Sequence, residues 1–253
     1  MKIYFLGMPA MMIYNFGASI MRSAGDTKRP LYFLTISGVV NIILNLFFVI
    51  LLRLDVVGVA IATVISQIVS AILILVHMTR SDEWYKFSWK KLKIYPEKLT
   101  KIISIGLPAG LQGTVFSISN VVLQSSINSF GSIAMNGNTA AANLEGFMYL
   151  SVNAFHQSSV SFTGQNIGAG KYKRAGKIMR TALSMAAAIS IVMGGVFLLA
   201  REPLLHIYLP NSEEAVAYGI RRLLVICSTY CLCAGTDVMT GVLRGMGSSI
   251  APT

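Results

Sequence analysis

Two long apolar runs decide the fold class of this chain: LYFLTISGVVNIILNLFFVILL at residues 31–52 and VVGVAIATVISQIVSAILILVHM at residues 56–78. Neither run contains Asp, Glu, Lys or Arg. Each is long enough to cross a bilayer as a helix, which takes about 20 mostly apolar residues. Both are too long and too weakly alternating to be strands of a membrane barrel. They therefore predict two neighbouring transmembrane helices.

Five further apolar runs surround this pair. They lie at residues 3–21, 102–129, 133–162, 178–200 and 216–243. The chain of 253 residues is 54% hydrophobic and 12% charged, whereas a soluble domain carries about 25% charged residues. That composition excludes a disordered chain and argues against a soluble globule. The sequence predicts an all-α polytopic membrane protein with about seven transmembrane helices, of which 133–162 is the most polar.

Positive charge is concentrated in alternate connections. Sixteen of the 21 Lys and Arg lie at the exits of the first, third, fifth and seventh predicted helices. The opposite side holds Lys2, Arg53, Arg201, Arg221 and Arg222. Because basic connections stay inside, the basic side is expected to be cytoplasmic and Met1 to be outside. The net charge of +11 then reflects the topology of the chain, and no nucleic-acid partner is expected. We expect a multi-pass protein of the plasma membrane, which in bacteria is the inner membrane.

The chain divides at a basic linker. Residues 79–101 carry seven Lys and Arg, with Trp84 and Trp89 among them, which predicts an interfacial segment. Residues 1–78 before the linker hold three predicted helices. Residues 102–253 after it hold four.

A short repeat relates the two parts. SIMRSAGDTKRP at residues 19–30 recurs as GVLRGMGSSIAP at residues 241–252, each time at a helix exit on the basic side. The aligned pairs are Arg22 with Arg244, Gly25 with Gly247, and Pro30 with Pro252. An even number of helices separates the copies, so the copies share one orientation. This predicts parallel repeats about an axis along the membrane normal, a common transporter symmetry.

Several motifs resemble one family of transporters. They are MRSAGDTKRP at 21–30, NIILNLFFVI at 41–50, GVAIATVISQ at 58–67, GLPAGLQ at 106–112, GQNIGAGKYKRA at 164–175 and VLRGMG at 242–247. In this order and spacing the chain resembles the multidrug and toxic compound extrusion (MATE) family. The resemblance implies two six-helix lobes, of which this chain would hold helices four to ten. It also implies a secondary antiporter, not an enzyme, that exports organic cations or xenobiotics in exchange for Na⁺ or H⁺ without a cofactor.

Ionisable groups inside a membrane are costly and need a reason. Glu145, Asp237 and His156 are the candidates for coupling to a cation. Glu145 begins a polar stripe that continues at helical spacing through Tyr149, Asn153, His156 and Gln157. The stripe predicts either a proton or sodium site or hydrogen bonds that hold the bundle together. The sequence leaves both open.

Asp237 has a more ordinary alternative. It lies two turns before Arg244 and could be an interfacial acid paired with that residue. In the MATE family the acid of the corresponding helix would fall nearer Cys233, so the resemblance leaves an ion site at Asp237 in doubt. One branch of the MATE family carries an acidic residue on the helix that corresponds to residues 102–129. In this chain the matching region reads Phe116 and Ser117, so that acid is absent. The coupling ion is therefore left open between Na⁺ and H⁺.

A second polar stripe follows the run at 102–129. It comprises Gln112, Ser117, Asn120, Gln124 and Asn128. None of these side chains titrates. They suit the lining of a cavity for a small, cationic ligand, and packing between helices is the alternative.

The remaining motif residues are expected to be structural. Arg22, Gly25, Asp26, Gly164, Gln165 and Arg244 form a predicted cytoplasmic-loop motif. The GQNIGAG segment lacks the Gly-Lys-Ser/Thr ending and the preceding strand of a phosphate-binding loop. Three clustered cysteines, without an accompanying group of His or carboxylates, indicate neither a disulfide framework nor a metal site.

Three other functions are compatible with a polytopic chain. A flippase or exporter of a lipid-linked substrate should have a strongly basic central cavity, and no Lys or Arg is predicted at mid-span. A seven-helix channel or receptor does not explain the repeat. A non-functional transporter fragment is the third alternative.

The predicted orientation can be tested with single cysteines. In a chain without its native cysteines, Lys91→Cys and Lys173→Cys should be shielded from an impermeant thiol reagent in intact cells. Ser212→Cys should be labelled. The reverse pattern would place sixteen basic residues outside and would contradict the orientation.

Overall fold

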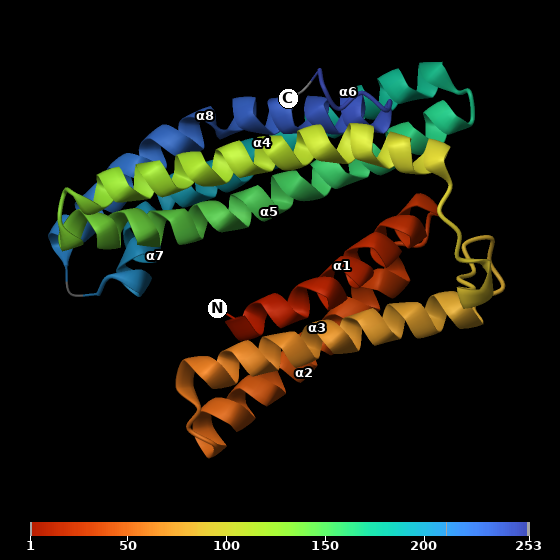
Figure 1. The fold of residues 1–253 in the computed structure, drawn as a ribbon. Helices are drawn as coiled ribbons and strands as arrows, with labels where there is room; N and C mark the ends of the chain where they lie inside the picture. Colours follow the sequence, from red (N-terminus) through yellow and green to blue (C-terminus); the bar gives the residue numbers. More distant parts are fainter. Residues whose placement is uncertain (1, 211, 252–253) are drawn as a thin grey trace. The chain divides into compact units, whose positions relative to one another are not determined.

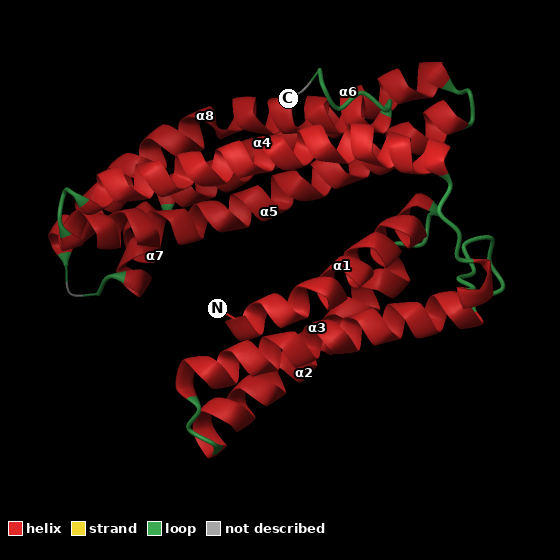
Figure 2. Cartoon of the chain, viewed as in Figure 1, coloured by secondary structure: helices red, strands yellow, loops and turns green. Residues whose placement is uncertain are grey.

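Helices account for the regular structure of the chain (Figure 2). The computed structural model describes residues 2–210 and 212–251. Met1 and Pro252, on which the predicted orientation and repeat partly rest, lie outside these ranges. The α-helices are α1 (Lys2–Ser23), α2 (Lys28–Leu46), α3 (Asp55–Arg80), α4 (Pro96–Asn128), α5 (Ser132–Gly168), α6 (Tyr172–Leu199), α7 (Arg201–Tyr208) and α8 (Glu213–Gly245). A π-helix, Phe47–Leu51, continues α2, and a 3₁₀ turn covers Trp89–Lys91. The all-α prediction is confirmed.

The count of membrane helices differs by one from the prediction. Six described helices are long and apolar enough to span: α1, α2 with its π-helical end, α3, α4, α6 and α8. The predicted span 133–162 lies in α5, which is not among them. With 37 residues α5 is about 55 Å long at 1.5 Å per residue, so its length suffices. Its polar side chains lower its mean hydropathy. A second difference is α7, a short helix where a connection was expected.

The chain forms two compact units, residues 1–93 and 94–253. In the first unit α3 packs against both α1 and α2 (Figure 1). Met21 of α1 and Ile74 and Met78 of α3 lie at its core, together with Tyr85 of the linker. The backbone N–H of Phe87 donates to the Met78 carbonyl (2.9 Å). The start of the basic linker is thus anchored to α3.

The second unit is built around α5. This helix packs against α4, α6 and α8, and α6 and α8 also pack against each other. Its buried face contributes Leu144, Met148 and Val152 to a core with Leu223 and Val238 of α8. Along α4, all of which the structure describes, no residue is buried. The second unit therefore has a tight α5–α6–α8 core with α4 packed against its side.

The sequence repeat is a repeated helix cap. At the end of α1, Gly25 N–H donates to Arg22 O (3.0 Å) and Asp26 N–H to Met21 O (3.0 Å). At the end of α8, Gly247 and Ser248 make the same pair of bonds, to Arg244 and Leu243. Both glycines have a positive φ, +92° and +87°, as this Schellman cap requires. The repeated glycine therefore ends each helix with its last carbonyls satisfied.

A missing side chain lets α5 and α8 approach closely at their outer ends. A Cβ on Gly137 would collide with the Ala215 carbonyl oxygen and lie 2.9 Å from Tyr218 Cβ. A Cβ on Gly146, further along α5, would meet no other atom within 4 Å. The close contact therefore depends on Gly137 in particular.

Gly137→Ala should separate the two helices, since a backbone carbonyl cannot move aside. We expect a loss of about 1–3 kcal/mol, as for other overpacked sites. Gly146→Ala is the matched control and should be neutral or stabilising by up to about 1 kcal/mol, because Ala favours helix. Thermal denaturation in detergent measures both. Equal stability of the two variants would contradict the close approach.

Candidate functional site

A cavity of about 750 Å³ lies in the second unit between α4, α5 and α8. It collects most of the predicted polar residues from three separate helices. From α4 come Gln112 and Asn120, from α5 Tyr149, Asn153, His156 and Gln157, and from α8 Asp237 and Arg244. The sequence predicts the residues of α4 and of α5 as two separate stripes, with Asp237 and Arg244 in neither. Thr236 and Thr240 of α8 complete the polar lining and were not predicted, because they show no distinctive pattern.

His156 is fixed by a hydrogen bond to α8. Its Nδ1 lies 2.7 Å from the backbone carbonyl oxygen of Asp237. Since a carbonyl can accept only, Nδ1 must carry the hydrogen and donate. The other ring nitrogen, Nε2, is then an acceptor in the neutral ring. His156 therefore presents a single proton-accepting atom while it ties α5 to α8.

Asp237 supplies the carboxylate of the cavity. It is half-buried, and its side chain makes no ion pair among the residues that the structure describes. The expected pairing with Arg244 is not observed. Arg244 Nη2 instead donates to Gln112 Oε1 of α4 (2.6 Å). The Asp237 carboxylate thus remains available to a cationic ligand, with one guanidinium nearby.

Arg244 belongs to a link between the end of α8 and α4. Besides its bond to Gln112, Ser249 Oγ donates to the Ile105 carbonyl (2.8 Å). Together the two bonds join α4 to the end of α8 and to the segment that follows it, where the second copy of the sequence repeat leaves the helix. They position Gln112 at the cavity wall.

Glu145 does not line the cavity. Its Oε2 lies 2.7 Å from Arg222 Nη2, and Arg222 Nη1 also donates to Asn138 Oδ1. Both charged side chains are about 29% exposed. Arg222, which the charge pattern counts on the outer side, lies within α8. Asn138 and Glu145, two turns apart on one face of α5, are the sequence signal that a basic partner faces them.

The other predicted residues lie apart from the cavity. Ser117 Oγ donates to the Gly113 carbonyl (3.0 Å), and Gln124 Nε2 donates to Asn128 Oδ1 (3.1 Å), all on exposed parts of α4. Gly164 and Gln165 lie in the last turns of α5.

The predicted loop motif in the first unit forms a polar cluster. Asp26 pairs with Arg29 (3.2 Å), whose guanidinium also contacts His77 Nε2 (3.3 Å) and the Tyr85 hydroxyl (3.4 Å). Arg22 Nε donates to the Ala18 carbonyl (3.2 Å). Arg29, held by Asp26, thus connects the start of α2 to α3 and the linker.

Solved structures with the same fold are MATE transporters. A MATE protein in its bent conformation superposes with a TM-score of 0.87 at 20% identity, over 99% of this chain and 56% of that one. A transporter of the MOP superfamily from Pyrococcus furiosus also gives 0.87 at 20% identity, over 94% of this chain and 54% of that one. The chain therefore has the polytopic all-α fold seen in MATE transporters.

The sequence comparison agrees with the fold. The profile described as MatE matches residues 108–253, and the chain belongs to this family. The profile of the lipid II flippase MurJ matches residues 1–131. The chain is a multi-pass membrane protein, and its bacterial relatives place it in the inner membrane.

Curated relatives come from several bacteria. The probable multidrug resistance protein YpnP of Bacillus subtilis is 28% identical over 99% of this chain and 56% of its own length. The multidrug export protein MepA of Staphylococcus haemolyticus is 23% identical over the full chain and likewise 56% of its own length. An FAD transporter of Shewanella oneidensis is 28% identical over 69% of this chain and 40% of its own length. The chain thus spans about half the length of the curated relatives it matches.

The Glu145–Arg222 pair should behave as one stabilising unit. Glu145→Gln or Arg222→Gln alone leaves the other charge unpaired, and each should cost about 1–3 kcal/mol. The double variant should lose less than the sum of the two singles, because it removes both charges. Thermal denaturation of the wild type, the two single variants and the double variant gives a double-mutant cycle. Glu214→Gln, at an exposed site of α8, is the control. If the effects of the two single variants were strictly additive, the pair would be contradicted.

Proposed function

We propose that this chain forms the cation-binding part of a secondary multidrug efflux transporter. The α4–α5–α8 cavity binds an organic cation, and the transporter exports it in exchange for Na⁺ or H⁺. The single observation that carries this proposal is the convergence of Asp237, His156 and polar side chains of three helices on one cavity. The names of several relatives, which are multidrug resistance or export proteins, support the same class.

The chemistry of the cavity suits an organic cation. The Asp237 carboxylate provides the charge, and Phe116 and Tyr149 add aromatic surface at the wall. A cation over an aromatic face gains about 0.5–2 kcal/mol, and this gain tolerates differently shaped ligands. The volume of about 750 Å³ falls within the usual range for drug-sized molecules. Such a site selects ligands by their positive charge and apolar surface, and not by one particular chemical structure.

Antiport follows if the organic cation and the coupling ion compete for the Asp237 carboxylate. A proton or Na⁺ on Asp237 neutralises the charge that an organic cation needs, so binding of one releases the other. His156 supports this exchange, because its Nε2 can accept a proton in the same cavity. Glu145 is a weaker candidate, since Arg222 already neutralises it outside the cavity.

A second candidate is export of an anionic or lipid-linked substrate. Arg244 also lines the cavity, and the MurJ profile and the FAD transporter are similar to this chain. Against it, Arg244 already donates to Gln112, and Asp237 would repel an anion. The cationic ligand is therefore the better supported of the two.

Asp237→Asn tests the proposal, because it keeps the size of the side chain and removes its charge. In a strain without its own multidrug pumps, with the protein expressed from its complete reading frame, export of a cationic dye should fall about tenfold or more. That loss corresponds to at least one charged interaction of about 1.4 kcal/mol. The dependence of the remaining transport on pH or Na⁺ should flatten.

Glu213→Gln, an exposed change at the start of α8, serves as the matched control and should leave export unchanged. Wild-type export with an unchanged ion dependence in Asp237→Asn would contradict the proposal. Export of an anionic dye that is lost in Arg244→Gln would favour the second candidate instead.

A further inference from the structure

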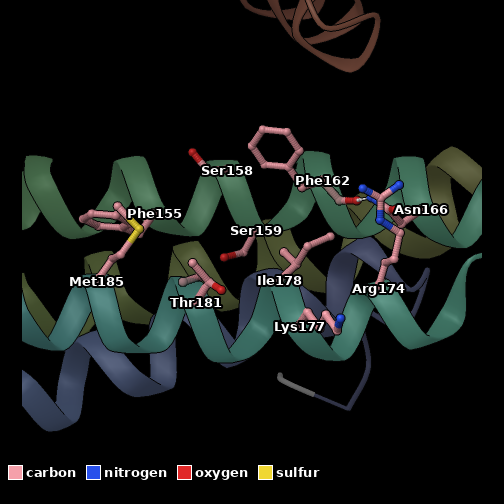
Figure 3. A pocket seen from close by; sticks show the side chains of 11 residues that line it. Phe155, Ser158, Ser159, Phe162, Asn166, Arg174, Lys177, Ile178, Thr181 and Met185 are labelled. Carbon is pink, nitrogen blue, oxygen red and sulfur yellow. Dashed lines mark hydrogen bonds between the residues drawn. The ribbon is translucent and has the colours of Figure 1, made fainter.

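A second cavity, of about 550 Å³, opens between α5 and α6 (Figure 3). It shares no lining residue with the first cavity. At 3.6 residues per turn, its α5 residues Phe155, Ser159 and Phe162 lie on nearly the opposite face from Asn153 and Gln157 of the first cavity. It is therefore a separate site, independent of the proposed transport function.

The lining changes from apolar to basic along the helices. Phe155 and Met185 lie at one end, and Asn166 and Arg174 at the other (Figure 3). Lys177 adds a second positive charge one turn from Arg174. Residues 174 and 185 are eleven positions apart on α6, which corresponds to about 16 Å. The basic end is at the start of α6, on the side that the charge pattern predicts to be cytoplasmic.

The basic side chains of Arg174 and Lys177 have no acidic partner among the described residues. Among the described residues, neither Arg174 nor Lys177 takes part in an ion pair, and both are exposed. The sequence from 164 to 180 contains no Asp or Glu. The two positive charges at the cavity mouth are thus left to a ligand or to solvent.

A polar group also lies within the apolar part. Ser159 is 1% exposed, and its Oγ has no hydrogen-bond partner among the described atoms. In Figure 3 it lies across from Thr181 of α6, between the basic and the apolar ends. A buried hydroxyl without a partner is costly, so an acceptor from a ligand would be stabilising at this level.

We propose that this cavity binds an anionic phospholipid of the inner leaflet. The order of its lining matches the order of groups in such a lipid. The phosphate lies at Arg174 and Lys177, an ester carbonyl accepts from Ser159, and an acyl chain lies against Phe155 and Met185. The acyl end points toward the middle of the bilayer, as the orientation of α6 requires. Basic recesses between membrane helices on the cytoplasmic side are a recurring form of acidic-lipid site.

The test uses the purified chain in nanodiscs with a photoactivatable phosphatidylglycerol. The crosslinked peptides should come from α5 and α6 at the cavity. The double variant Arg174→Gln, Lys177→Gln should weaken labelling about tenfold or more, since each basic group near an acidic lipid contributes several-fold. The double variant Lys171→Gln, Lys173→Gln is the matched control, because it removes the same charge just outside the cavity.

A second variant distinguishes lipid binding inside the cavity from general attraction of acidic lipids to the basic surface. Thr181→Trp fills the middle of the cavity and leaves every charge in place, so it should also abolish labelling there. A photoactivatable phosphatidylcholine should label the cavity at least tenfold less. Equal loss in the two double variants, or unchanged labelling with Thr181→Trp, would overturn the proposal. Crosslinks between two copies through α6 in place of lipid would also overturn it and assign the cavity to a protein interface.

Discussion

The second unit depends on the enclosure of a polar helix within a bilayer. α5 carries Asn, Gln, His, Glu and several hydroxyl groups, and its composition falls outside that of the six apolar helices. A polar side chain without a partner is costly in hydrocarbon. The helix is therefore stable there only where neighbours satisfy it. Contacts with α4, α6 and α8 provide that environment.

Some polar groups of α5 are satisfied by α8, and others are not. Glu145 and Asn138 share Arg222 of α8, which neutralises the acid near the outer end. Further along, His156 donates to a backbone carbonyl of α8, and its side chain lines the first cavity. Ser159 has no hydrogen-bond partner among the atoms that the structure describes. The Glu145–Arg222 pair and the His156 bond hold α5 to α8, and His156 and Ser159 line the two cavities.

The two cavities differ in charge and in position. One contains a carboxylate and is lined mostly by polar side chains, which suits a cation. The other has one lysine and one arginine at its mouth and an apolar interior, which suits an acidic lipid.

The class of protein and the six described apolar membrane helices follow from the amino-acid sequence, whereas the short helix α7 does not. Long apolar runs, basic connections and the Arg-x-x-Gly repeat depend on local physics: hydrophobic thickness, charge asymmetry and the positive φ that a glycine permits. Periodicity also placed Tyr149, Asn153 and His156 on one face of α5. It could not show which helix faces them.

The partners of the charged side chains depend on how the helices pack. Arg222 lies near the end of an apolar run and was assigned to the outer connection, but it reaches Glu145 on a helix 77 residues away. Arg244 is two turns from Asp237 in sequence, yet it bonds to Gln112, 132 residues away. Such pairings depend on the packing distance and rotation of whole helices. Sequence spacing fixes only which residues share a face of one helix, and the partner across the interface is set by how two helices pack.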